Sequence, residues 1–164
     1  MAELTHINNE GRAKMVDVSD KQATVREAIA CGTVFVSADT FKIITQGESK
    51  KGDVLSVAQV AGIMAAKRTS EIIPMCHPIN ITGVDISFNL DEECNTIEIT
   101  AIVHSKGETG VEMEALTAVS VTALTIYDMC KSLQKDIKIS DIKLVKKTGG
   151  KSGDYIKTEK RSKK

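Results

Sequence analysis

Apolar and polar residues alternate along two neighbouring segments near the middle of the chain. Residues 84–90 and 96–103 alternate apolar and polar side chains, which is typical of strands with one buried face. The polar residues 91–95 between them are typical of a turn, so the two strands are predicted to form a β-hairpin. β-Branched and aromatic residues predict another strand at 33–36, and alternation resumes at 137–145, where a last strand is predicted.

Apolar residues recur at helical spacing in three other segments. The longest, between residues 109 and 131, has no charged residue from 115 to 127 and is predicted to be a largely buried helix. A second helix is predicted over residues 54–65, with Asp53 as its N-cap. A short helix is predicted directly after Ser37, which would cap it.

The order of these elements indicates the fold class. Without the short helix, the order is strand, helix, strand, strand, helix, strand. This order favours an α+β fold of the ferredoxin-like type, in which two helices pack on one face of an antiparallel sheet. The 164 residues suffice for one domain with its own core. We expect this single domain to span residues 1–154, and residues 155–164 to form a basic, flexible tail.

The charge of the chain is balanced overall but uneven along its length. The formal net charge is zero, whereas the segment from Lys146 onward carries eight basic residues against Asp154 and Glu159. The balanced charge, an aromatic content of 3% and the absence of Trp do not favour a surface that binds nucleic acid. We therefore interpret the end of the basic segment as solvated chain.

The sequence favours a reducing, aqueous environment. The four cysteines form no Cys-x-x-Cys motif, no secretory segment begins the chain, and Cys76-His77 has no second ligand pair at zinc-type spacing. Charges near both ends of the longest helix leave an apolar stretch too short to span a membrane. We therefore expect a cytoplasmic protein that binds neither a metal nor a membrane.

Carboxylates near both ends of the longest helix are the first candidates for chemistry. Thr109 and Glu112 fit a capping box, and a purely structural Glu112 is as good an interpretation as a functional one. Glu114 neither caps the helix nor faces a Lys one turn on. Asp128 and Lys131 are predicted to form an ion pair, which can be purely structural. We expect the apolar helix face to leave the pair poorly solvated, which makes proton transfer an alternative role, although the pKa of Lys131 must fall before it can act as a base.

The two ends of this helix cannot both contact one small ligand within a single chain. Glu114 and Asp128 are fourteen residues apart, which corresponds to about 21 Å at the rise of an α-helix. If both act in one reaction, they must come from different subunits. The site would then lie across a subunit interface, which would also bury the apolar helix.

A segment between two prolines, residues 74–78, carries the next candidate. The prolines stiffen the chain around His77, although a lone His is more often structural than catalytic. A nucleophilic pair of Cys76 and His77 is not favoured, because adjacent side chains of an extended chain point in opposite directions.

Basic residues near predicted element ends are candidates for binding an anion. Lys51 stands just before a predicted helix N-terminus, where an anion is favoured, but a solvated pair of Lys50 and Lys51 explains the spacing equally well. The segment 147–153 is rich in Gly and Lys but lacks the first Gly of a Walker motif, and no helix follows it. We interpret it as a flexible basic loop that folds over a phosphorylated ligand.

Four long and unusual segments follow one another between Leu4 and Asp154: LTHINNEGRAKMVDVSDK, AGIMAAKRTSEIIPMCHP, TGVEMEALTAVSVTALTIYDMCK and KKTGGKSGD. In this order they are similar to the cyclic pyranopterin monophosphate synthase family of molybdenum cofactor biosynthesis. The resemblance implies the ferredoxin-like fold and a homohexamer, built as a trimer of dimers, with active sites between subunits. It also implies a lyase without a cofactor, which rearranges (8S)-3',8-cyclo-7,8-dihydroguanosine 5'-triphosphate to cyclic pyranopterin monophosphate and releases pyrophosphate.

The resemblance also implies roles for individual residues. It implies that Asp128, Lys51 and Lys131 are catalytic. The implied substrate-binding residues are Met75, Cys76, His77, Met113, Glu114, Arg26 and Lys147, of which Arg26 and Lys147 would contact the triphosphate. These residue types suit the reaction, because it needs several proton transfers and fixed cations beside the departing pyrophosphate.

A different class of function is the alternative to this enzyme. A ferredoxin-like module could bind a ligand or RNA and contact phosphates through its basic tail. The low aromatic content and the carboxylates on the apolar helix argue against this alternative. The sequence leaves open whether Mg²⁺ accompanies the triphosphate, because no dedicated cage of oxygen ligands is visible.

Overall fold

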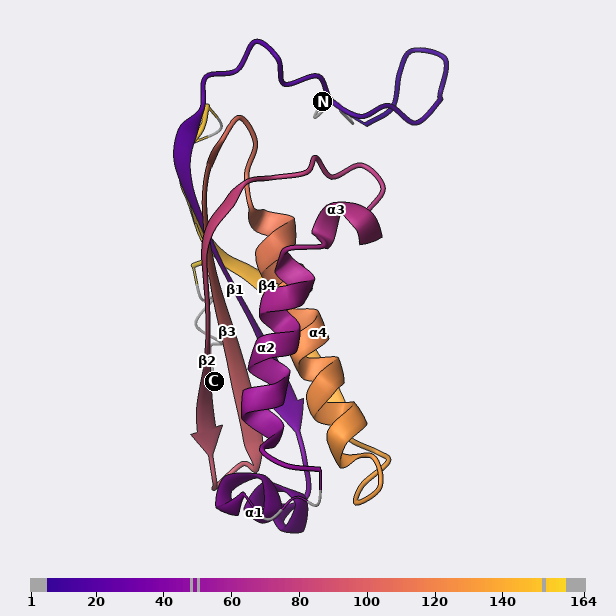
Figure 1. Ribbon diagram of the computed structural model, residues 1–164, viewed down its shortest axis with the longest axis vertical. Helices are drawn as coiled ribbons and strands as arrows, with labels where there is room; N and C mark the ends of the chain where they lie inside the picture. The colour runs from indigo at the N-terminus through magenta and orange to yellow at the C-terminus, as the bar shows by residue number, and fades with distance from the viewer. Residues whose placement is uncertain (1–5, 48, 50, 152, 159–164) are drawn as a thin grey trace.

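A five-stranded sheet and a layer of helices make up the chain (Figure 1). This computed structural model describes residues 6–47, 49, 51–151 and 153–158. In chain order the elements are β1 (Thr24–Phe35), α1 (Ala38–Gln46), α2 (Val54–Ala66), α3 (Thr69–Ile72), β2 (Ile81–Asp91), β3 (Thr96–Gly107), α4 (Glu112–Cys130), β4 (Lys138–Thr148) and β5 (Tyr155–Ile156).

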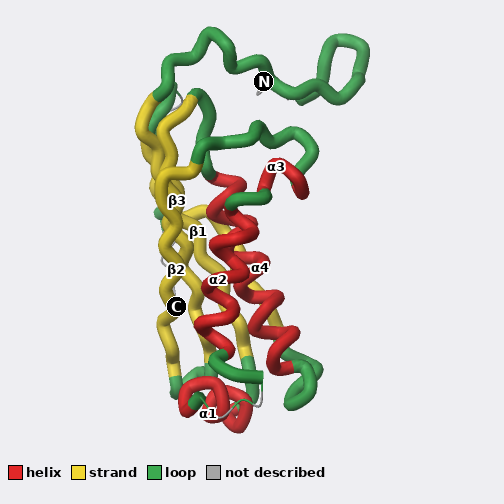
Figure 2. Tube along the Cα trace, viewed as in Figure 1, coloured by secondary structure: helices red, strands yellow, loops and turns green. Residues whose placement is uncertain are grey.

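The sheet has the strand order β2-β3-β1-β4-β5, and every neighbouring pair is antiparallel. The helices α2 and α4 lie side by side on one of its faces (Figure 2). This arrangement confirms the predicted α+β fold with two helices on an antiparallel sheet, including the hairpin formed by β2 and β3. The sequence did not predict α3 or β5. The strand β5 lies within the range expected as a tail, whereas residues 159–164 of that range lie outside the described residues.

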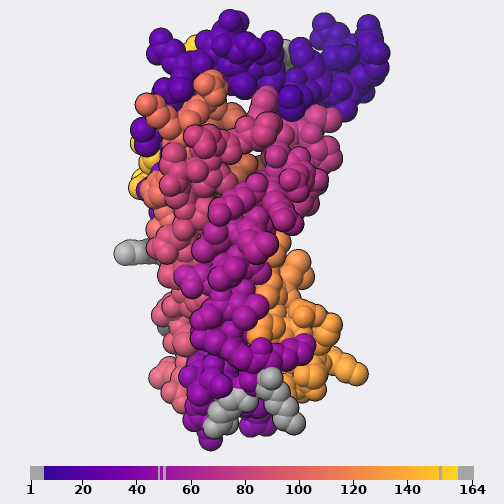
Figure 3. All heavy atoms as spheres, viewed as in Figure 1, coloured from indigo at the N-terminus to yellow at the C-terminus, as the bar shows by residue number. Residues whose placement is uncertain are grey.

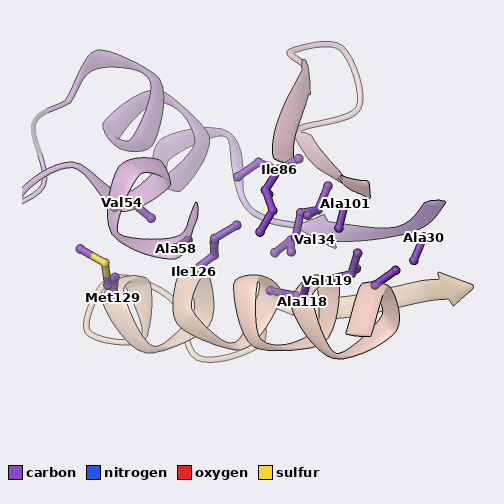
Figure 4. Packing of buried hydrophobic residues seen from close by; sticks show 14 of the residues in the cluster. Ala30, Val34, Val54, Ala58, Ile86, Ala101, Ala118, Val119, Ile126 and Met129 are labelled. Carbon is purple, nitrogen blue, oxygen red and sulfur yellow. The ribbon is translucent and has the colours of Figure 1, made fainter. Parts of the chain in front are cut away.

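The core fills the space between the sheet and these two helices. Residues of β1 alternate between the two faces of the sheet, so that Ala28, Ala30 and Val34 are fully buried beneath the helices. Figure 4 shows side chains of α4, including Ala118 and Ile126, directed into this core. Because β1 and α4 pack closely here, their ends are held in fixed positions around the clefts described below.

The helix caps test three predictions from the sequence. The side chain of Ser37 accepts a hydrogen bond from the backbone of α1, and that of Asp53 accepts one from the backbone of α2, as predicted. The capping box that Thr109 and Glu112 could have formed is absent from the described residues. The helix α4 begins at Glu112, its N-cap residue is Val111, and no side chain caps it. Glu112 instead pairs with a Lys of β4, and this tertiary ion pair replaces the local cap.

The chain before β1 crosses one end of the domain. Residues 15–23 have no helix or strand, and the segment covers the end of the molecule where α4 begins (Figures 1 and 3). At the opposite end lie α1 and the end of α4. Among the described residues, no helix has the length and apolar character needed to cross a membrane.

Candidate active site

A first cleft of about 400 Å³ lies beside the start of α4. It is formed by the chain before β1, the loop that follows α3, the loop between β3 and α4, and the first turn of α4. The cleft brings together five of the predicted substrate-binding residues, which are Met75, Cys76, His77, Met113 and Glu114. The first three belong to the stiff segment between the prolines, and the last two are fixed by the helix.

Glu114 is the most perturbed ionisable group of this cleft. It is 2% exposed, and among the described residues its Oε2 atom has no hydrogen-bond partner. Burial raises the pKa of Glu114 to about 7, and the negative charge of Glu112 adds to this effect. Near neutral pH, Glu114 is therefore an acid that is easily protonated or deprotonated, as a group that transfers protons must be.

His77 has a defined hydrogen bond in the same cleft. Its Nε2 atom lies 2.7 Å from the backbone oxygen of Val16. Because a carbonyl oxygen can only accept, Nε2 carries a proton, and in the neutral ring Nδ1 is left with the lone pair. The neighbouring Cys76 is a poor nucleophile, since burial and the charge of Glu114 raise the pKa of its thiol. This agrees with the expectation that the two residues do not form a nucleophilic pair.

A second cleft of about 780 Å³ contains the predicted phosphate-binding residues Arg26 and Lys147. Arg26 is nearly buried, and its guanidinium group donates hydrogen bonds to the backbone oxygens of Gly107 at 2.8 Å and Glu108 at 3.0 Å. The turn after β4 packs directly against Arg26. Both glycines of this turn, Gly149 and Gly150, have positive φ angles, and a Cβ atom on Gly150 would overlap the guanidinium group.

The two clefts adjoin each other. Both are lined by Lys21, Thr109, Gly110 and Glu112. Lys147 also reaches this shared wall, because its Nζ atom pairs with the Oε1 atom of Glu112 at 2.9 Å. A ligand with a polar ring system at one end and a polyphosphate at the other could therefore occupy both clefts at once.

The three predicted catalytic residues lie together at the far end of α4. The Nζ atom of Lys131 pairs with Asp128 at 2.6 Å, as predicted, and the Nζ atom of Lys51 donates to the backbone oxygen of Asp128 at 3.0 Å. The latter bond satisfies one of the carbonyl groups left open at the end of a helix. Lys51 is thus placed by the loop before α2, close to the helix that ends with the other two residues.

The expected poor solvation of this pair is wrong. The side chains of Asp128 and Lys131 are 63% and 53% exposed. The hydrogen bond and charge of Lys131 lower the pKa of Asp128, and those of Asp128 raise the pKa of Lys131. Within the protomer Lys131 is therefore an ammonium ion that can donate a proton but cannot accept one.

The protomer does not bring the two groups of residues together. Glu114 and Asp128 are fourteen positions apart in one continuous helix, so they lie about 21 Å apart along its axis. Much of α4 is already buried within the protomer, mainly through α2 and the sheet. The predicted burial of this helix therefore does not by itself require a partner, although Leu124 on it is 58% exposed.

Several residues of the clefts were not predicted. His6, Val16, Val18 and Lys21 line the first cleft, and Lys21 also lines the second. No local pattern marked them, because they belong to a segment without helix or strand that only the tertiary fold brings to α4. In the described part of the chain, no group of His, Cys, Asp and Glu side chains is arranged to hold a metal ion.

Comparison with known proteins identifies the family. The model of the MoaC family matches residues 15–150. The cyclic pyranopterin monophosphate synthase of Thermoanaerobacter sp. strain X514 is 66% identical over 152 residues, which cover 93% of this chain and 96% of the relative. A relative of the same name from Heliobacterium modesticaldum is 60% identical over 159 residues, which cover 97% of this chain and 100% of the relative. Another, from Bacillus mycoides, is 58% identical over 159 residues, which cover 96% of this chain and 99% of the relative. These matches establish that the chain belongs to the MoaC family.

Proposed function

We propose that this chain is a cyclic pyranopterin monophosphate synthase of molybdenum cofactor biosynthesis. It would rearrange the cyclised dihydroguanosine triphosphate to cyclic pyranopterin monophosphate and release pyrophosphate. Its membership of the family and the name of its relatives support this proposal. The observation that carries it is the junction of two clefts. One contains a buried carboxyl group that can be protonated, and the other contains the nearly buried guanidinium group of Arg26 beside Lys147.

The second cleft would bind the polyphosphate. Arg26 offers a planar set of donors, and its backbone partners hold it in place without neutralising its charge. Lys147 lines the same cleft from β4. Charge develops on the departing pyrophosphate as the cyclic phosphate forms, and fixed cations stabilise that charge without having to reorganise.

The first cleft would bind the ring system and transfer protons. In its protonated form Glu114 donates a hydrogen bond, and in its ionised form it accepts a proton. In its neutral form, His77 supplies an acceptor at Nδ1 while Val16 holds its Nε2–H. Met75 and Met113 contribute adaptable apolar surface at the side of a flat ligand.

The third group of residues would come from a second copy of the chain. Lys51, Asp128 and Lys131 carry charges suited to proton transfer, but they lie at the wrong end of α4 to reach a ligand in the two clefts. An assembly of several copies, which we propose to be a hexamer arranged as a trimer of dimers, would bring this end of one protomer to the clefts of another.

The outer surface of α2 supports an assembly. Val57, Val60 and Met64 lie on one side of this helix and are 46%, 57% and 48% exposed. Such an apolar stripe is typical of a surface that another protein covers. The four cysteines are free thiols, which suits the reducing cytoplasm where we place the enzyme.

Turnover of the cyclised nucleotide tests the proposed activity. We expect the wild-type protein to release pyrophosphate and form the pterin product, and Asp128→Asn to lose at least about a hundredfold in kcat. Asp136→Asn is the matched control, because Asp136 is exposed and lies beyond the end of α4. A wild-type protein that binds the nucleotide without converting it would refute the enzymatic function.

Coexpression of two inactive variants tests whether the site is shared. Mixed assemblies of Lys147→Gln and Asp128→Asn would contain intact sites, about a quarter of the total, because each site takes these residues from different copies. A mixture of Lys131→Ala with Asp128→Asn is the control. Both changes lie in one cluster, so this mixture has no intact site and stays inactive. If neither mixture regains turnover, the shared site is wrong.

A further inference from the structure

An ion pair stands between the two clefts. Glu112 is the first residue of α4 and lines both clefts, and Lys147 lies near the end of β4. The two side chains are 27% and 24% exposed, so the pair is more shielded from water than a surface salt bridge. Glu112 thus neutralises a cation in the cleft that would receive a polyphosphate.

The second cleft remains cationic around this pair. Its lining contains four basic residues and three acidic ones: Lys21, Arg26, Lys147, Lys151, Asp20, Glu108 and Glu112. In the described residues no carboxylate forms an ion pair with Arg26, whose partners are backbone oxygens. An incoming anion therefore meets two different cations. Among the described residues no carboxylate pairs with Arg26, whereas Lys147 is already paired with Glu112.

The position of the Glu112 carboxylate depends on a glycine. The carboxylate lies so close to Gly110 that a Cβ atom at position 110 would overlap both its oxygens and its carbon. The side chain of Glu112 is therefore folded back over the N-terminus of α4. Because Glu112 also lines the first cleft, its carboxylate can turn towards that cleft when it leaves Lys147. Glu112 can leave Lys147 by rotating its own side chain, without movement of the backbone.

We propose that Glu112 is a displaceable counter-ion, which holds Lys147 in the free protein and gives it up to a phosphate group of the ligand. This inference rests on the proposed function, since it concerns the same polyphosphate cleft. When a monoanion displaces Glu112, Lys147 loses its contact with the carboxylate and gains one similar contact with the anion. A ligand with adjacent phosphates can instead contact Arg26 and Lys147 together. Glu112 would therefore make the cleft selective for polyphosphates over single phosphates.

Calorimetric titration with pyrophosphate and with inorganic phosphate tests this role. Removal of the competing charge in Glu112→Gln should tighten pyrophosphate binding roughly tenfold, because an ion pair no longer has to be broken. The variant should tighten the binding of inorganic phosphate by a larger factor than that of pyrophosphate. The ratio of the two affinities, which measures the preference for pyrophosphate, should therefore become smaller. Glu108→Gln is the matched control, because Glu108 lines the same cleft, is exposed and has the same charge. We expect it to change the affinity by less than about threefold.

The outcomes separate this role from general electrostatics and from the proposed activity. Equal effects of the two variants, or weaker binding by Glu112→Gln, would overturn the counter-ion role. Gly110→Ala is a second variant that pushes the carboxylate off Lys147 without changing the charge, and it should tighten pyrophosphate binding by about threefold. If neither Gly110→Ala nor a folded Glu112→Gln binds more tightly, the role is wrong. A response of binding as predicted, together with no turnover by the wild type, would instead refute the enzymatic function alone.

Discussion

Replacement of Glu114 by Gln should make the stability of this protein much less dependent on pH. Glu114 is buried in the first turn of α4, and one of its oxygens has no hydrogen-bond partner in the part of the chain that the structure describes. Burial, with a further contribution from the charge of Glu112, raises the pKa of Glu114 from 4.5 to about 7. Gln has the same size and stays neutral at every pH, so Glu114→Gln removes the ionisation while it keeps the packing.

The size of the effect follows from the difference between the folded and unfolded pKa values. A gap from 4.5 to about 7 corresponds to about 3 kcal/mol of unfolding free energy, at about 1.4 kcal/mol per pKa unit. The folded state holds the proton more tightly than the unfolded state. Protonated Glu114 therefore stabilises the folded state fully at pH values below its unfolded pKa of 4.5. This stabilisation decreases as the pH rises towards 7 and is lost above the folded pKa.

Urea unfolding at about pH 4.5 and about pH 8, at one fixed protein concentration, measures this effect. The difference in unfolding free energy between Glu114→Gln and the wild type should shift by about 3 kcal/mol in favour of the variant between these two values. Glu108→Gln provides the control, because Glu108 is exposed. If the difference for Glu114→Gln is the same at both pH values, the carboxyl group titrates normally and our account of the first cleft is wrong.

Three further substitutions test the turn, the helix packing and the outer surface. Gly149→Ala should lower the free energy of unfolding by about 2 kcal/mol in urea titrations, because Gly149 has a positive φ and a Cβ atom there would overlap the backbone oxygen of Val25. Gly62→Ala should lower it by about 1 to 3 kcal/mol, because the added Cβ atom would overlap the hydroxyl group of Thr122 on α4; an unchanged urea midpoint would show that the two helices can separate without cost. Met64→Glu should reduce the mass found by sedimentation while the circular dichroism stays unchanged, and an undiminished mass would show that the apolar stripe of α2 is not an interface.

Much of the fold could be predicted from the sequence because the signals for its elements are local. Alternation over 84–90 and 96–103 needs only the pleat of a strand, and Ser37 and Asp53 cap helices that begin a residue later. The capping box at Thr109, one of the two interpretations of Glu112, is not formed. A local pattern of that kind competes with distant partners, and here Lys147, thirty-five positions along the chain, takes the carboxylate of Glu112.

Two kinds of information in the sequence predicted parts of the candidate site: the segments that resemble the family, and the geometry of the long helix. The resemblance named residues of both clefts, and the structure brings Met75 and Glu114 into one of them. The solvation of Asp128 and Lys131 was misjudged, because an apolar sequence around a charged pair does not show on which side of the helix solvent lies. Lys21 was missed for a related reason, since its position depends on how an irregular segment crosses the end of the domain.

If both ends of α4 act in one reaction, as we propose, the inference of a shared site survives these errors, because it then depends only on the length of the helix. An α-helix rises by about 1.5 Å per residue whatever covers it, so Glu114 and Asp128 stay about 21 Å apart in any packing of α4. The fold adds a second constraint: Lys51 comes from a different segment, yet it binds the last turn of α4 and not the first. The cations of the far end therefore form one unit that moves with the end of the helix. Only another copy of the chain can bring such a unit to the clefts at the other end, and this is why the mixing of inactive variants is the decisive experiment for the proposed mechanism.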